Sequence, residues 1–206
     1  MDTKHRILDE ALTLFSQKGY ANVYVGEIAE KVGIKAPSLY KHYRNKQAIF
    51  DAIIEEMNKR YEEQAGALNI NGMNPASDAS LYENISEDRL VEIGTGLFLY
   101  FLHDDYTSRF RKILTIEQFH NKEFAALYSS QYVDGPFSYQ KMLFELMAAG
   151  GSFASADTDV MTLQFYSPIY LLLTLCDREP DREAEACKLL EKHFRQFGRI
   201  YGGRQK

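Results

Sequence analysis

The chain has 206 residues, of which 45% are hydrophobic, and a formal net charge of −5. This length and composition can bury a sizeable core, so we expect a soluble globular protein of one large or two small domains. The first 50 residues hold eight Lys or Arg and five Asp or Glu, a net +3, which leaves 16 against 24, a net −8, for the rest. Because phosphates repel an anionic body, only the basic head is expected to meet nucleic acid.

Secretion and membrane insertion are not expected. The first 20 residues alternate charged and apolar positions, unlike a signal peptide, and the longest later apolar run, Ile169 to Cys176, is too short to cross a bilayer. Cys176 and Cys187 have no metal-ligand spacing and are expected to be reduced core thiols. We therefore expect a cytoplasmic protein that has no membrane partner, cofactor or bound metal.

The first elements of the chain are predicted to be two helices. The first runs from about Thr3 to Lys18, ends at Gly19, and has one apolar face formed by Ile7, Leu8, Ala11, Leu14 and Phe15. Ile28, Ala29 and Val32 recur at the spacing of a second helix face, and Gly33 follows where a helix end favours positive φ. The second helix is therefore expected to end at Val32.

A third helix is predicted to begin near Ala36, because Pro37 suits a first helical turn and Leu39 and Tyr43 repeat at i, i+4. From residue 31 to residue 46 there is one His and no Asp or Glu, but there are five cations: Lys31, Lys35, Lys41, Arg44 and Lys46. Helix, tight turn and cation-rich helix form the layout of a helix-turn-helix DNA reader. A helical hairpin with a solvated basic face is the alternative, but it would not need Gly33, Pro37 and the flanking apolar register.

The first quarter of the chain resembles the amino-terminal DNA-binding domain of TetR-family transcriptional regulators. The residues that carry the resemblance are Arg6, Ile7, Leu8, Ala11, Leu14, Phe15, Gly19, Tyr20, Ile28, Ala29, Val32, Gly33, Ile34, Leu39, Tyr40, Tyr43, Lys46 and Phe50. It implies an all-helical protein with a helix-turn-helix DNA-binding domain over residues 1–46 and a helical effector-binding and dimerisation domain over residues 47–206.

The same resemblance implies the DNA contacts. Tyr40 and Lys46 are expected on phosphates, Lys41 and His42 near base edges, and Ala36, Pro37 and Ser38 at the floor of the groove. The chain departs from the family in two places. Tyr24-Val25-Gly26 stands where Thr or Ser usually caps the second helix, and Lys35 stands where a small hydroxyl residue often precedes the third. At Lys35 either the cap is lost or the lysine contacts a phosphate or a guanine, and we favour the phosphate.

The rest of the chain is also predicted to be helical. Asn45 is a good N-cap for a helix that reaches about Ala65, and residues 66–86 are expected to form a mobile connection holding one short helical piece at most. Further helices are expected from Ser86 to the Asp104-Asp105 break and at about 107–119, 122–133, 137–149, 158–176 and 181–198. Pro168 is expected to kink its helix by freeing the carbonyl of Gln164.

Two patterns in the sequence are candidate signs of an enzyme or a carrier. Glu117-x-x-His120 is spaced like a ligand pair of a di-iron bundle, but such a site needs a second pair and further inward glutamates. Gly94-Thr95-Gly96 lacks the third glycine and the preceding strand of a nucleotide-binding loop, so close helix packing explains it better. A helical-bundle enzyme or carrier with an unrelated basic hairpin stays the rival interpretation.

The body is rich in aromatic residues, since residues 87–177 hold 16 of the 27 Phe and Tyr. Most of these are expected in the core, but several have polar tips or neighbours, as small-molecule sites do. TetR-like regulators typically bind an effector in this part. We therefore predict a small apolar or aromatic effector bound by residues from the set Tyr100, Phe101, Gln118, His120, Tyr128, Tyr132, Gln164 and Tyr170.

The last helices are expected to form a homodimer. The final helix is amphipathic, and with Ile169 to Leu175 it supplies more apolar surface than one small body needs; its apolar residues are Ala186, Leu189, Leu190, Phe194 and Phe197. The resemblance makes this the dimerising pair of helices. The sequence therefore predicts a homodimeric regulator that binds double-stranded DNA at a pseudo-palindromic operator, as a repressor that a small effector releases.

Overall fold

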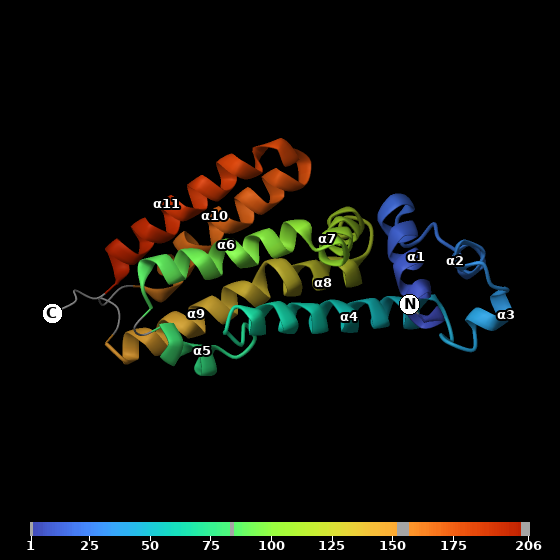
Figure 1. Ribbon diagram of the computed structural model, residues 1–206, viewed down its shortest axis with the longest axis horizontal. Helices are drawn as coiled ribbons and strands as arrows, with labels where there is room; N and C mark the ends of the chain where they lie inside the picture. Colours follow the sequence, from blue (N-terminus) through green and yellow to red (C-terminus); the bar gives the residue numbers. More distant parts are fainter. Residues whose placement is uncertain (1, 83–84, 152–156, 203–206) are drawn as a thin grey trace. The chain divides into compact units, whose positions relative to one another are not determined.

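The computed structural model describes residues 2–82, 85–151 and 157–202. Over these ranges the chain forms helices and turns and no β-strand, which confirms the expected all-helical class (Figure 1). The helices are α1 (Thr3–Lys18), α2 (Val25–Val32), α3 (Ala36–Leu39), α4 (Lys46–Ala67), α5 (Pro75–Tyr82), α6 (Glu87–His103), α7 (Asp105–Glu117), α8 (Lys122–Tyr132), α9 (Asp134–Ala149), α10 (Thr158–Arg178) and α11 (Glu183–Tyr201), with a 3₁₀ turn at Pro180–Arg182.

The chain divides into two compact units, each assembled from two stretches of sequence. Unit 1 consists of Met1–Tyr61 and Asp104–Tyr128, and unit 2 consists of Glu62–His103 and Ser129–Lys206. Unit 1 therefore contains α1 to α3, most of α4, α7 and the start of α8. The predicted boundary at residue 46 separates a DNA-binding domain from an effector-binding and dimerisation domain by their functions, and it stays a prediction.

The core of unit 1 is built around α1. This helix contacts both α2 and α7, and its residues Ile7, Ala11, Leu12 and Phe15 are completely buried. Beside them lies an aromatic cluster in which the Phe50 ring is 5.1 Å from Tyr20, 5.6 Å from Phe110 and 5.1 Å from Phe124, between ring centroids. Each such pair adds about 0.5–1.5 kcal/mol beyond the area it buries. The cluster, Phe15, Tyr20, Phe50, Phe110 and Phe124, thus joins the amino-terminal helices to α7 and α8 within one unit.

Helix ends in unit 1 are fixed by Gly19 and Asn45, as the sequence predicts, and by Asp2, which the sequence analysis did not identify as a cap. The Asp2 carboxylate accepts the His5 N–H at 2.9 Å at the start of α1, and Gly19, with φ 80°, ends that helix. Asn45 Oδ1 accepts the Ala48 N–H at 2.8 Å, which confirms Asn45 as the N-cap of α4. Each of these side chains satisfies a backbone group that the helix leaves unpaired.

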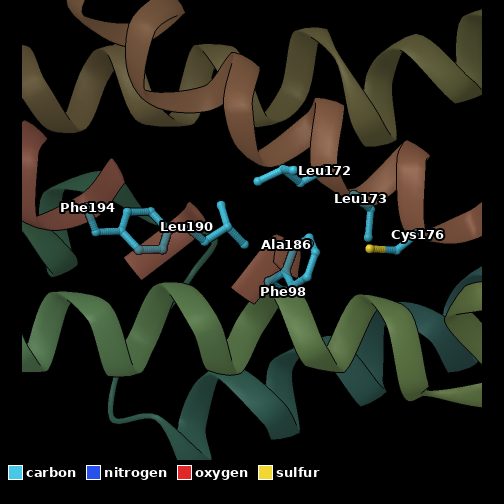
Figure 2. Packing of buried hydrophobic residues seen from close by; sticks show 7 residues of the cluster. All are labelled: Phe98, Leu172, Leu173, Cys176, Ala186, Leu190 and Phe194. Atoms are coloured by element: carbon cyan, nitrogen blue, oxygen red, sulfur yellow. The ribbon is translucent and has the colours of Figure 1, made fainter. Parts of the chain in front are cut away.

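Two large apolar cores and a smaller cluster around Ala65, Ile70 and Ile93 lie in the described part of unit 2. In the first, α6, α10 and α11 enclose seven buried residues, which Figure 2 shows: Phe98, Leu172, Leu173, Cys176, Ala186, Leu190 and Phe194. The second joins α5, α9, α10 and α11 through Ala79, Leu143, Phe144, Met147, Met161 and Phe197. Leu190, Phe194 and Phe197, which the sequence analysis places at a dimer seam, are therefore buried within the unit itself. Both cysteines are free thiols, Cys176 buried and Cys187 half-buried, as expected.

The connection between α4 and α6, predicted to be mobile, is anchored by one buried carboxylate. Asp78 is completely buried in α5 and accepts the N–H groups of Asn71 and Gly72 at 2.7 and 2.8 Å and the Tyr139 hydroxyl at 2.6 Å. A buried carboxylate is stable only when such donors surround it. The prediction of a mobile linker was therefore wrong for the described part of this segment. Tyr139 of α9 holds the segment in place through Asp78, and the composition of the segment does not indicate this contact.

Prolines lie in two of these helices. The sequence predicts a helix beginning at about residue 137, but Asp134-Gly135-Pro136 already forms the first turn of α9; a first turn tolerates proline because its N–H groups have no partner within the helix. Pro168 lies inside α10 as expected. In the same helix the Phe165 carbonyl lies 2.9 Å from His193 Nε2, and the predicted freeing of the Gln164 carbonyl stays a prediction.

Within the described ranges, no helix is both long and apolar enough to cross a membrane.

At Gly94 the backbone of α6 packs closely against a side chain of α11. A Cβ at this position would lie 2.4 Å from the ring of Phe194, which is completely buried. The glycine pair of the Gly94-Thr95-Gly96 sequence is therefore used for helix packing, since a Cβ at Gly96 would likewise meet Leu68 at 3.1 Å.

We predict that Gly94→Ala lowers the free energy of unfolding by about 1–3 kcal/mol, the usual cost of overpacking a core. Urea denaturation followed by circular dichroism measures this change. Gly66→Ala is the matched control, because Gly66 is helical and a Cβ there meets nothing within 4 Å. The control should gain up to about 1 kcal/mol from helix propensity. Equal stability of the two variants would contradict the packing role of Gly94.

Candidate nucleic-acid interface

The turn between α2 and α3 has the geometry of a helix-turn-helix. Gly33 adopts the left-handed conformation, with φ 77° and ψ 31°. The N–H of Gly33 bonds to Glu30 O at 3.0 Å and that of Ile34 bonds to Ala29 O at 2.9 Å, the two bonds of a Schellman motif. A side chain at Gly33 would strain the backbone, so the predicted helix stop is confirmed.

The amino end of α2 is capped in a way that the sequence analysis missed. Tyr24 is 72% exposed and makes no side-chain cap, whereas the Glu27 carboxylate accepts the Tyr24 N–H at 3.1 Å. The same carboxylate accepts from Lys18 Nζ at 2.6 Å, and this bond contributes most to lowering the pKa of Glu27. A Glu three residues after the N-cap was the available signal, because it forms the reciprocal half of a capping box.

Helix α3 begins at Ala36 as predicted, but only the stretch to Leu39 is α-helical. Tight turns continue to Tyr43, whose N–H bonds to Leu39 O at 3.1 Å. Lys35 occupies the N-cap position without a side-chain hydrogen bond, so the cap is absent there. Buried Leu39 and Tyr43 hold this segment on the core and leave Pro37, Tyr40, Lys41 and His42 exposed, while Ala36 and Ser38 are half-buried.

Four cations of this segment are exposed and make no ion pair within the described part of the chain. Lys31, Lys35, Lys41 and Arg44 are all exposed, and none of them makes an ion pair with a described residue. Exposed Lys and Arg without an internal partner are free to neutralise phosphates. The predicted DNA-contacting residues therefore lie on an accessible basic surface, and their individual contacts stay predictions.

Lys46 differs from the other cations because its ammonium group donates hydrogen bonds to backbone carbonyls of the protein. Its Nζ donates to Tyr20 O at 2.8 Å and to Val23 O at 2.9 Å, and it lies 4.4 Å from the centroid of the Tyr20 ring. Burial lowers the pKa of Lys46. The structure thus gives Lys46 a role in holding the α1–α2 loop, and its predicted phosphate contact stays a prediction.

The residues predicted to bind an effector fall into several groups. Tyr100 and Phe101 have adjacent rings on α6, with centroids 5.5 Å apart. The Tyr132 carbonyl accepts the Tyr166 hydroxyl at 2.8 Å, and the Tyr166 ring is 6.4 Å from Tyr170. In unit 2, Gln164 is exposed and bonds to Tyr201; in unit 1, Gln118 is half-buried, His120 is exposed and Tyr128 is buried.

A cavity of about 260 Å³ lies elsewhere in unit 2. Its walls are mainly apolar, with polar groups from Asn69, Tyr82 and Arg89; the apolar lining residues are Ile70, Leu81, Ile85 and Ile93. None of the eight predicted effector residues lines it. Sequence reasoning missed this cavity because it treated residues 66–86 as a linker.

The Glu117-x-x-His120 pattern, like the glycine pair described above, has a structural explanation. Glu117 is buried and accepts the Tyr20 N–H at 2.8 Å, whereas His120 is exposed, so the pair does not converge on a common ligand. Among the residues that the structure describes, no three His, Cys, Asp or Glu side chains are grouped as a metal site requires.

Comparison with known proteins points to one family. Residues 7–53 match the family of bacterial regulatory proteins described as the tetR family. The biofilm operon icaADBC HTH-type negative transcriptional regulator IcaR of Staphylococcus epidermidis is 46% identical over 52 residues, which cover 25% of this chain and 28% of that protein. The chain thus matches this curated relative over little more than a quarter of the relative's length.

Solved structures share the fold over the whole chain. The structure of SmeT, the repressor of the Stenotrophomonas maltophilia multidrug efflux pump SmeDEF, superposes with a TM-score of 0.66 at 16% identity and covers 100% of this chain and 93% of that one. A SmeT–triclosan complex gives a TM-score of 0.67 at 14% identity, with coverage of 100% and 94%. At these identities the likeness concerns the fold.

We predict that Lys35→Ala weakens duplex binding and lowers the slope of log K against log[salt] by about 0.9, the contribution of one phosphate contact. Fluorescence anisotropy at several salt concentrations measures the slope. Lys112→Ala is the matched control, because Lys112 is an exposed cation on α7, outside the helix-turn-helix. An unchanged slope for Lys35→Ala would remove Lys35 from the phosphate contacts.

Proposed function

Because its amino-terminal domain places this chain in the TetR family of bacterial regulatory proteins, we propose that it is a sequence-specific DNA-binding transcriptional regulator that represses its target genes. Proteins of this family are transcriptional regulators rather than enzymes. The observation that carries the proposal is the helix-turn-helix turn at Gly33, followed by exposed cations that no described residue neutralises. Repression is proposed because IcaR is a negative regulator and SmeT is a repressor. The proposed place of action is the cytoplasm.

We propose that the regulator acts as a homodimer on a pseudo-palindromic operator. Two recognition segments reach successive major grooves when they lie about 34 Å apart, which a two-fold dimer provides. A face of α10 supports this proposal, because Val160, Leu163 and Leu171 are 48%, 56% and 61% exposed at helical spacing. On α11, Leu189 and Ile200 are also exposed, at 43% and 56%. These five residues, rather than Leu190, are the proposed seam.

We propose further that a small apolar or aromatic effector releases the operator. SmeT has been solved in complex with triclosan, an example of a small ligand bound by a protein of this fold. Two places in this chain are candidates: the predicted aromatic residues, with Tyr132 and Tyr170 among them, and the cavity beside Leu81 and Arg89. A coupling of about 1–3 kcal/mol would change operator affinity about 5- to 150-fold, enough to control transcription.

The test of the DNA-binding proposal is selection of bound sequences from a pool of random duplexes. A regulator of this kind should enrich one inverted repeat and bind it more tightly than a scrambled duplex, with affinity that falls steeply as salt rises. If no duplex is enriched and binding is insensitive to salt, the rival interpretation, a helical-bundle enzyme or carrier, is favoured.

For the dimer, we predict that Leu171→Glu yields a folded monomer, because it places a carboxylate in the proposed apolar seam. Sedimentation velocity measures the mass, and operator affinity should fall because two half-sites are no longer bound as one unit. Ile116→Glu is the control, since Ile116 on α7 is 50% exposed and lies outside the seam. A Leu171→Glu variant that remains dimeric would locate the seam elsewhere.

For the effector, we predict that a binding ligand, tested first with triclosan as the probe, raises the melting temperature and weakens operator binding. At a concentration 100 times its Kd a ligand stabilises the protein by about 2.7 kcal/mol. Leu81→Trp should abolish this effect if the cavity is the site, and Tyr170→Leu should abolish it if the aromatic residues are. A ligand that stabilises the protein without changing operator affinity would argue against an effector role.

A further inference from the structure

Two charged side chains, distant in sequence, hold the loop between α1 and α2. Glu117, the last residue of α7, accepts the Tyr20 N–H on its Oε1 at 2.8 Å. Lys46, the first residue of α4, donates to the carbonyls of Tyr20 and Val23 at 2.8 and 2.9 Å. All four residues belong to unit 1. The Tyr20 residue is thus bound on its N–H by an anion and on its carbonyl by a cation.

The burial of these groups makes the arrangement expensive to disturb. Glu117 is only 7% exposed, and a buried carboxylate is destabilising once it loses its hydrogen-bond donor. The attraction of Glu117 acts to raise the pKa of Lys46, against the larger lowering that burial causes, so the two charges interact across the loop.

The backbone of the loop is shaped to admit the carboxylate. Gly19 has a φ of 80°, and a Cβ there would lie 2.6 Å from Glu117 Oε1, so the carboxylate occupies the space that a side chain would fill. The Tyr20 ring lies 5.1 Å from Phe15 and 5.2 Å from Phe124, and its hydroxyl donates to Gln47 at 2.8 Å. Because ring, hydroxyl and backbone are all held, Tyr20 cannot move independently of α4 and α7.

The contacts of Glu117 and Lys46 with the α1–α2 loop lie next to the proposed DNA-binding segment in the chain. The segment Asp104–Tyr128 enters unit 1 from unit 2 and returns to it, so α7 is one covalent route between them. Lys46 follows Arg44, the last exposed cation of the basic segment, after one intervening residue, Asn45. A shift at the end of α7 would therefore move the α1–α2 loop and the start of α4, which together flank the helix-turn-helix.

We propose that Glu117 is a positioning residue for operator binding: by holding the Tyr20 backbone against Lys46 it fixes the orientation of the helix-turn-helix. The inference rests on the proposed function. It assigns to Glu117 an effect on DNA binding without any contact with DNA.

The test compares Glu117→Ala and Glu117→Gln with Glu55→Gln, an exposed glutamate on α4 whose change removes the same charge. Operator affinity, its salt slope and the hydrogen exchange of the Tyr20 amide are measured on full-length protein well below the melting temperature. We expect Glu117→Ala to lower operator affinity by about 5- to 150-fold and to accelerate Tyr20 exchange at least about tenfold. The salt slope should stay unchanged, because no phosphate contact is lost.

The conservative variant separates positioning from charge. Glu117→Gln keeps an acceptor for the Tyr20 N–H, so it should restore Tyr20 protection and most of the affinity. If Glu117→Ala does not fold, Glu117→Asp replaces it, since the shorter acid keeps the charge but cannot reach Tyr20, and the same losses are expected. A rapidly exchanging Tyr20 amide combined with wild-type operator affinity in either variant would overturn the inference. Failure of the wild-type protein to bind any duplex would instead overturn the proposed function.

Discussion

The fold of unit 1 depends on how Tyr20 is enclosed. Its ring packs among Phe15, Phe50 and Phe124, and its peptide groups are bound by the buried Glu117 carboxylate and the half-buried Lys46 ammonium group. The aromatic rings add apolar burial, whereas the charged groups fix geometry, because charge-assisted hydrogen bonds to the backbone hold in few arrangements. The helix-turn-helix is therefore oriented by polar contacts and stabilised by apolar ones.

Much of the fold could be predicted from the sequence, since the signals were local. Gly33 ends α2, Pro37 lies in the first turn of α3 and Asn45 caps α4, and each residue type acts on its own backbone. The basic surface was predictable for the same reason, because charge density is a property of a short segment. The Glu27 half of the capping box was equally local, although Tyr24 lacks the aliphatic hydroxyl of the Ser or Thr that usually forms the other half.

The remaining features depend on partners far away in the sequence. Nothing near Asp78 indicates that Tyr139 would meet it and turn a polar connection into an ordered one. The periodicity of α11 identified an apolar face but not which part of it the chain itself would bury, so buried Leu190 could not be told from exposed Leu189. Glu117 was considered beside His120 as a ligand pair because spacing along a helix is visible in a sequence, whereas a backbone N–H presented by another loop is not.

The shared core of unit 1 also limits how this protein can be recombined with others. A chimeric regulator made by cutting after α3 would separate Tyr20 and Phe15 from Phe110, Phe124 and Glu117, which the chain supplies about 90 to 100 residues later. The transplanted helices would lose their aromatic neighbours and leave a peptide group without its acceptor. A DNA-binding domain that is to be transferred to another protein must therefore include the Asp104–Tyr128 segment, as one discontinuous module.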